Sequence, residues 1–333
     1  GAKGVNQQPK PNDEVDELLV QGMNRLTFDE LQKEQDDLHG VADDAAERAP
    51  RMNRLLAGLD DHLKEMKAGT AYECAESINK EYVSERDFRL RFLRANRYDP
   101  QASADRMIRF FATKLSLFGI HKLVKDISLS DLDEDDVECL LNGSTFLSDY
   151  KDRAGRCIIF HLPGLRRYKT LENELRARYY LYMHVCKTLD SPNRGIVVVV
   201  YQVGHFKGTL GGAGTKETTL LLQAMPWRIV GSHMCFEHSP SAMLAKAAAV
   251  VAPAKTRAKM RVHRGTDMEL QYTLGSYGIP RRSVQQLFLN QQDFIFDHQL
   301  SWYHDCMEKE TASQQFRINN LIAPNENDVL YLG

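Results

Sequence analysis

The sequence predicts an α/β protein in which an all-helical part precedes a mainly parallel sheet. Two observations favour this class. Apolar residues recur at helical spacing, between helix-capping motifs, throughout residues 14–142. After Asn142-Gly143, short apolar runs alternate with helical patterns, which is typical of a parallel sheet. The unbroken apolar run over residues 196–200 further indicates a strand that is covered on at least one face.

The helical part contains a series of recognisable helix starts. Thr27 and Glu30 form a capping box, and Pro100 follows Asp99 at the first helical position, where its missing N–H needs no partner. The segment 84–87 resembles a capping box with a shorter acid. The predicted helices begin, in order, near residues 27, 50, 84, 99 and 130.

The second part contains the alternating strands and helices. A turn over residues 152–155 precedes the first predicted strand. The predicted strands cover residues 156–162, 195–203, 227–236 and 259–263. The predicted helices cover residues 171–190, 215–225, 241–251, 267–275 and 283–310.

The charge distribution points to an anionic partner. Residues 150–280 carry 19 basic and 8 acidic side chains, a net charge of +11, whereas the whole chain has −2. Lys246 is the single charge of the segment 241–251, so this helix is buried or contacts lipid. An almost uncharged helix beside cations suits a membrane surface, although a solvated strand edge would show the same charges. The cations that follow are Lys255, Arg257, Lys259, Arg261 and Arg264.

Several classes of protein lack support in the sequence. The basic residues carry neither a nucleic-acid-binding motif nor interleaved aromatic residues, so we expect no nucleic acid partner. The six cysteines lack zinc spacing and read as reduced thiols of a cytosolic protein. No apolar run approaches the length of a membrane span, and no signal peptide is visible. Because the chain starts at Gly1 and ends at Gly333, we expect it to be a fragment.

Three motifs resemble the CRAL-TRIO family of lipid-binding proteins, which includes the yeast phosphatidylinositol transfer protein and the tocopherol and retinal carriers. They are the segment 92–99 (FLRANRYD), the segment 225–228 (MPWR) that runs on to His233, and the segment 277–280 (YGIP). The residues at 38–41 and 328–333 resemble versions from unicellular algae. The resemblance divides the chain into a disordered tail (1–13), an acidic helical leader (14–69), a helical subdomain (70–142), a lipid-binding domain (143–285) and a C-terminal helix and tail (286–333).

The resemblance implies an apolar pocket whose floor is the sheet and whose mobile gate is the helix 241–251. The ligand would be a sterol, an isoprenoid or a phospholipid, and the protein would work at membranes from the cytoplasm without catalysing a reaction. Trp227 and Val250 replace the charged pair of the phosphatidylinositol-binding branch, which favours a less polar ligand. The implied pocket residues are Phe160, Tyr179, Met183, Tyr201, Leu221, Met225, Ile229, Met234 and Phe236. The implied gate residues are Met243, Leu244, Ala247 and Val250.

Two other functions compete with lipid binding. A regulatory or protein-interaction module could keep the fold with a filled pocket, and partners could bind the acidic N-terminal helices. A nucleotide-dependent enzyme could use the glycine-rich segment 211–216, but Thr215 separates Gly214 from Lys216 and disrupts the P-loop pattern. His205, His233 and His238 lack a fourth ligand at a telling spacing, so we expect no metal site.

Overall fold

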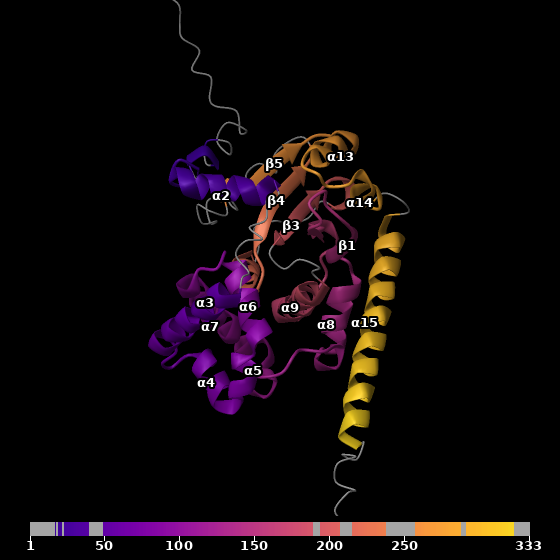
Figure 1. Ribbon diagram of the computed structural model, residues 1–333. Coiled ribbons are helices and arrows are strands. Elements are labelled where there is room, and N and C mark those ends of the chain that lie inside the picture. Colours follow the sequence, from indigo (N-terminus) through magenta and orange to yellow (C-terminus); the bar gives the residue numbers. More distant parts are fainter. Residues whose placement is uncertain are drawn as a thin grey trace, which may run out of the picture.

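The computed structural model shows a lobe of helices beside a helix-covered sheet (Figure 1). This confirms the predicted α/β class, with helices first and the sheet after them. None of the helices within the described residues is long and apolar enough to cross a membrane. The structure describes residues 17, 19–21, 23–39, 49–188, 194–206, 215–237, 257–287 and 291–322.

Every described element before residue 142 is helical, as the sequence predicts. The long helix α7 packs against α3, α4 and α6, and phenylalanine and tyrosine rings fill the space between these helices. The elements are α2 (Phe28–His39), α3 (Ala49–Met66), α4 (Ala71–Ile78), α5 (Lys80–Ser84), α6 (Arg86–Ala95), α7 (Pro100–Phe118), η2 (Ile120–Lys122), η3 (Leu129–Asp131) and α8 (Glu134–Leu141).

The capping predictions are confirmed in part. Thr27 and Glu30 form the expected reciprocal box, and Asp99 accepts a hydrogen bond from the backbone of Ala102 at 3.0 Å. The prediction of a cap at Ser84 is wrong, because Ser84 ends α5. The carboxylate of Glu85 caps α6 instead. Because glutamate is an uncommon N-cap, the sequence pattern predicts this boundary one residue too early.

The described strands form one sheet in the order β1-β2-β3-β4-β5, with β1 antiparallel to β2 and the other neighbours parallel. The edge strand β1 was not predicted, because its polar residues Ser148 and Asp149 hide the alternation of a strand. The strands are β1 (Thr145–Lys151), β2 (Cys157–His161), β3 (Ile196–Gln202), β4 (Ile229–Phe236) and β5 (Met260–Arg264). The later helical elements are η4 (Pro163–Leu165), α9 (Leu171–Thr188), η6 (Gly204–Phe206), α10 (Thr215–Ala224), α13 (Asp267–Ser276), α14 (Arg281–Gln285) and α15 (Gln291–Ile322).

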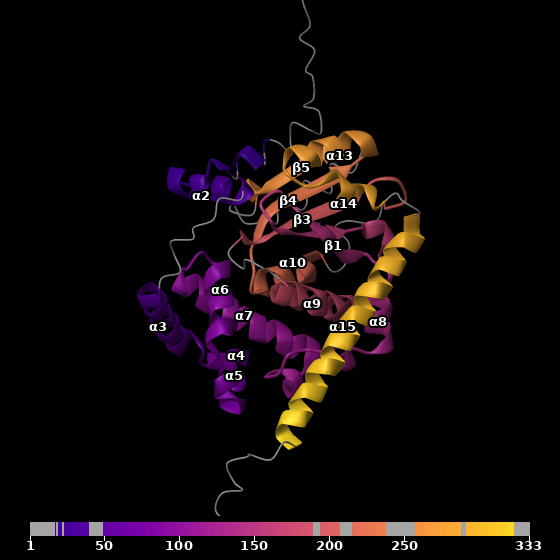
Figure 2. The ribbon, with the colours of Figure 1, turned by 45° about the vertical axis from the view of Figure 1, so that its right-hand side comes forward.

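Helices cover both faces of the sheet (Figure 2). On one face, here called the α9 face, Ile159, Ile196 and Val198 pack into the same core as α7 and α9. On the opposite face, the α13 face, Val197 and Val199 pack with two leucines of α13 and with Val284 of α14. Successive residues of a strand point to opposite faces, so the apolar run over 196–200 serves both cores.

The last helix, α15, runs along the outside of the domain (Figure 1) and is held there by hydrogen bonds at several positions. The side-chain amide of Gln299 donates to the carbonyl of Leu140 at 2.8 Å. Further along, the carboxylate of Glu310 accepts from the backbone of Leu129 and from the hydroxyl of Tyr180, each at 2.8 Å. The sequence predicted one helical stretch over 283–310, whereas the structure has the short α14 and the longer α15.

Candidate functional site

The predicted pocket residues fall into three groups. Phe160 and Tyr201 belong to the core on the α13 face. A second group packs into the main core of the helical lobe and the α9 face. The third group, Met234 and Phe236, forms a small separate cluster. The sheet separates the first group from the others, so the nine residues do not line one cavity. The second group comprises Tyr179, Met183, Leu221, Met225 and Ile229.

The small cluster lies at the outer half of the α9 face, and we call it the edge strip. It joins the β4 residues Met234 and Phe236 to Met260 of β5. The three side chains are nearly fully buried. The half-buried Val200 contacts both the edge strip and the main core, which places the two on the same face. Among the described residues, Leu19 is the one member of this cluster from outside the sheet.

The predicted gate lies outside the described residues, and so does the first cation of the predicted docking strip. This applies to the gate residues Met243, Leu244, Ala247 and Val250, and also to Lys255. Their chain segment leaves the sheet after Phe236, the last residue of β4, and returns before β5. The edge strip is therefore the described part of the molecule directly connected to the gate segment.

The four described cations of the predicted docking strip do not share one surface. Arg257 and Lys259 are buried. The guanidinium of Arg261 donates to the backbone carbonyls of Ala258 and Met260. Arg264 is half-buried at the carboxyl end of β5, opposite Phe236 in the register. Arg264 thus lies beside the Phe236 end of the edge strip, and Lys259 has a different role.

Lys259 holds the acidic leader against the sheet. Its ammonium lies 2.7 Å from a carboxylate oxygen of Glu34 and 3.1 Å from one of Asp37, both on α2. Arg228 donates to Asp37 from the start of β4, and Arg97 donates to Glu34 from the helical lobe. Both acids are buried. The leader is thus joined to both halves of the molecule at the amino edge of the sheet.

The cations at this edge lower the pKa of Asp37, an acidic residue of the leader. Burial alone would raise the pKa of Asp37, but the opposite charges of Arg228 and Lys259 outweigh burial and lower the pKa to about 2. Arg156 adds hydrogen bonds to the backbone carbonyls of Asp37 and Leu38. Each carboxylate and each named cation therefore has a partner here. The sequence indicated an acidic leader and a basic module, but it did not indicate that residues of the two would pair.

Trp227, which the CRAL-TRIO resemblance aligned with a charged residue of the phosphatidylinositol-binding branch, is a packing residue. Its side chain is buried, and its indole N–H donates to the carbonyl of Tyr182 at 3.2 Å. The two rings meet edge to face with centroids 5.4 Å apart. The neighbouring carbonyl of Met225 and that of Trp227 itself accept hydrogen bonds from Arg106. Trp227 therefore ties the start of β4 to α9 and to the helical lobe.

A buried polar cluster lies at the carboxyl edge of the sheet on the α9 face. His161 ends β2, with Nδ1 3.0 Å from the hydroxyl of Thr145 and Nε2 3.4 Å from that of Tyr182. Burial, and then the nearby charges of Arg178 and Arg166, lower the pKa of His161 to about 3, so the ring is neutral at pH 7. In parallel sheets, ligands bind outside the carboxyl ends of the strands, which makes this cluster a candidate site.

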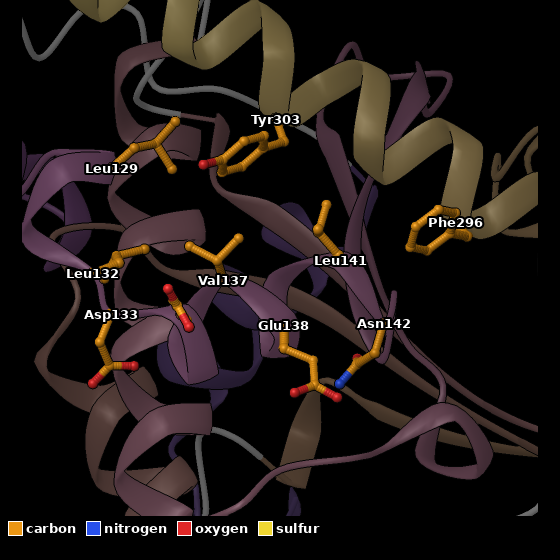
Figure 3. Close-up of a pocket in the computed structure, with 10 residues that line it drawn as sticks. Leu129, Leu132, Asp133, Val137, Glu138, Leu141, Asn142, Phe296 and Tyr303 are labelled. Carbon is orange, nitrogen blue, oxygen red and sulfur yellow. The ribbon is translucent and has the colours of Figure 1, made fainter.

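An open groove of about 640 Å³ lies between α8 and α15. Figure 3 shows its apolar side chains between the two helices, with Asp133 and Glu138 on the side away from α15. Phe296 is 47% exposed at one end of the groove. No local sequence pattern indicates this groove, because its two walls are more than 150 residues apart in the chain. The apolar lining residues are Leu129, Leu132, Val137, Leu141, Phe296 and Tyr303.

The described residues do not form a nucleophile–base pair poised for catalysis or a cluster of metal ligands. Cys306 and His184 approach to 3.5 Å, but burial raises the pKa of the Cys306 thiol to about 11, so it is not a thiolate at pH 7. No group of three potential metal ligands occurs in the part of the chain described. His233 instead stacks on His263, with ring nitrogens 2.9 Å apart. The glycines at 211–214 and His238 lie outside the described residues, as does the side chain of His205.

Comparison with models of known protein families finds no match, and neither does comparison with curated protein sequences.

Proposed function

We propose that the chain binds the apolar part of a lipid on the edge strip, without catalysis, and carries or presents it at membranes. The observation that supports this proposal is that the edge strip forms an apolar cluster distinct from the main core. Met234, Phe236 and Met260 share a face with α9, yet they form a cluster apart from its core. Burying such a side chain contributes about 1.5–3 kcal/mol, so this surface strongly favours an apolar cover.

The connections of the edge strip support a removable cover. The undescribed segment 238–256 joins the two strands of the strip and includes the almost uncharged run 241–251. A lipid bound between this segment and the strip could leave when the segment moves, which is the gate that the CRAL-TRIO resemblance implies. Sterols, isoprenoids and phospholipids all carry enough apolar surface for such a site.

Extraction of the purified protein with organic solvent, followed by mass spectrometry, tests the proposal. We expect a copurifying lipid in the wild type and its loss from the Phe236→Trp variant, because the larger ring fills the strip. The control is Leu220→Trp, a similar enlargement at an exposed position of α10. Circular dichroism must show that both variants are folded. Equal lipid content in all three proteins would overturn the edge strip as the site, and no lipid in any of them after exposure to vesicles would overturn lipid binding.

A second candidate function, a protein-interaction module, is favoured by the groove between α8 and α15. We propose that its partner is a basic amphipathic helix. The apolar lining would accept the apolar face of that helix, and the exposed Glu134 and Glu138 would attract its cations. The wild type should bind a designed leucine–lysine helix and not the matched leucine–glutamate helix. Phe296→Ala should weaken binding about tenfold or more, as loss of an interface anchor does. Equal binding of both peptides would exclude this role.

A further inference from the structure

The last residue of β3, Gln202, carries a buried donor without an acceptor. Its side chain is 4% exposed. Gln202 lies two residues beyond Val200, so it points to the α9 face at the carboxyl edge of the sheet. The amide nitrogen has no hydrogen-bond partner among the described residues. An unsatisfied buried polar group costs about 1–3 kcal/mol, and folded proteins keep few of them without a reason.

A second unused donor comes from α9, which covers the same face. Arg178 donates from Nη1 to the hydroxyl of Thr218 at 2.9 Å, and its Nη2 lies 2.7 Å from a carboxylate oxygen of Glu174. Its Nε is buried and finds no acceptor in the part of the chain described. Arg178 lies one turn before Tyr182 on α9, and the hydroxyl of Tyr182 is 3.4 Å from Nε2 of His161, the neighbour of Val200 in the register. Arg178 therefore lies near the carboxyl edge.

The surrounding charges favour an acid. Glu174 also accepts from Arg166, with Nε to Oε1 at 2.6 Å, so one carboxylate serves two guanidinium groups. His161 is neutral, as its lowered pKa shows. The cluster therefore has one excess positive charge and two unused N–H donors. A carboxylate or phosphate supplies both the negative charge and the acceptor oxygens.

An apolar surface begins beside these donors. Gln202 lies opposite Phe236 in the register of β3 and β4, and both lie on the α9 face. Polar donors at one end and the edge strip beside them match a molecule with an acidic head and an apolar tail. Met234 and Met260 extend the apolar surface away from the donors.

We propose that Gln202 and Arg178 form a head-group subsite that binds the carboxylate or phosphate of an amphipathic lipid. This inference rests on the proposed lipid-binding function and gives it a substrate class. The tail of the lipid lies along the edge strip, and the acidic oxygens accept from the amide of Gln202 and from Nε of Arg178. A purely neutral sterol or isoprenoid leaves both donors unused.

Matched probes test this subsite. The wild type is titrated with a pyrene-labelled fatty acid and its methyl ester, and with a labelled phosphatidic acid and the corresponding diacylglycerol. The acid of a pair should bind at least about tenfold more tightly, because a hydrogen bond to a charged group contributes about 1.5–3 kcal/mol. A preference in the first pair alone identifies a carboxylate ligand, and one in the second pair alone identifies a phosphate.

Two variants connect the preference to these residues. Gln202→Met keeps the side-chain shape without the donor, and Arg178→Lys keeps the charge without Nε. Each should reduce the preference for the acid about tenfold and leave binding of the neutral probe unchanged. Arg176→Lys, the same change elsewhere on α9, is the control. Equal binding of acid and neutral probe by the wild type, or an unchanged preference in both variants, would overturn the subsite while lipid binding stands. Failure to bind any probe would instead overturn the lipid-binding function.

Discussion

The two edges of the sheet use the same kinds of residue in different ways. At the amino edge, Arg97, Arg228 and Lys259 surround two carboxylates of α2, and each cation has an acidic partner. At the carboxyl edge, Arg178 and Gln202 each keep a donor that no described residue uses. A buried network with every group satisfied holds elements together. Unused donors beside an apolar strip instead suit a ligand.

The comparison also separates two kinds of basic residue in the positively charged module. Lys259 neutralises the leader and cannot attract a membrane while it is buried. Arg264, the last residue of β5, lies at the opposite edge beside the edge strip. Charge counted along the sequence treats the two alike, whereas the fold assigns one to structure and leaves the other near the candidate site.

The largest expected effect is at the amino edge. Asp37→Ala should lower the free energy of unfolding by about 3–5 kcal/mol, because it leaves buried cations without their partner. Asp36→Ala is the control one residue away, where Gln32 is the one donor to the carboxylate among the described residues, and it should change stability by less than about 0.5 kcal/mol. Urea unfolding measures both. Equal stability of the two variants would mean that α2 does not hold the sheet in this way.

The next largest expected effect is the dependence of stability on pH. Burial lowers the pKa of His161 and of His233 to about 3, and that of His263 to about 4. Below about pH 6.5 these histidines are therefore protonated in the unfolded chain but still neutral in the folded one. The free energy of unfolding falls as the pH drops from about 6.5 toward 4. Each such histidine contributes about 1.4 kcal/mol per pH unit in this range.

A histidine variant isolates the carboxyl edge in this pH dependence. His161→Gln should reduce the slope of unfolding free energy against pH by about 1.4 kcal/mol per unit between pH 6 and pH 4.5. The loss of Asp37 stabilisation, about 2 kcal/mol, has the same sign but begins only below its ordinary pKa of 3.8. An unchanged slope in His161→Gln would show that the ring is protonated in the folded protein.

The third prediction uses one substitution at two buried glutamines. In ligand-free protein, Gln202→Met should raise the free energy of unfolding by about 1 kcal/mol, because it removes an unsatisfied donor. Gln299→Met should lower it by about 1–3 kcal/mol, because the amide of Gln299 serves the carbonyl of Leu140. Thermal or urea unfolding compares the two. Destabilisation by both would indicate that Gln202 has a partner within the protein.

The sequence predicted the architecture well, because local signals carry it. Capping residues such as Asp99 and the apolar run of β3 act on their own segments. The helices and the parallel strands are therefore confirmed where the structure describes them. β1 was missed because a half-polar edge strand lacks a strong periodic pattern. The boundary at Glu85 was missed because glutamate seldom caps a helix.

The candidate site was harder to predict, because it depends on which face and which edge a residue occupies. Phe160 and Met234 are both large apolar residues of predicted strands, and the sequence does not show which face of the sheet each occupies. In the structure they lie on opposite faces. The role of Lys259 depends on Glu34, which lies more than 200 residues earlier in the chain. Gln202 carries no sequence signal at all. Gln202 becomes a candidate binding residue only because the fold buries its amide nitrogen without an acceptor among the described residues.

The smallest expected effect tests whether the carboxyl edge approaches membranes. Each arginine or lysine near an anionic surface contributes about 1 kcal/mol of binding, so Arg264→Gln should weaken binding to phosphatidylserine-containing vesicles about fivefold. Arg261→Gln is the matched control on the same strand, since strand alternation points Arg261 to the other face, where its guanidinium serves backbone carbonyls. Vesicle co-sedimentation at low salt measures the difference. Raised salt should weaken wild-type binding and narrow the gap between the variants, because salt screens surface charges beyond a Debye length. If Arg264→Gln binds vesicles like the wild type at low salt, this edge does not face the membrane, and any lipid must enter the edge strip from another direction.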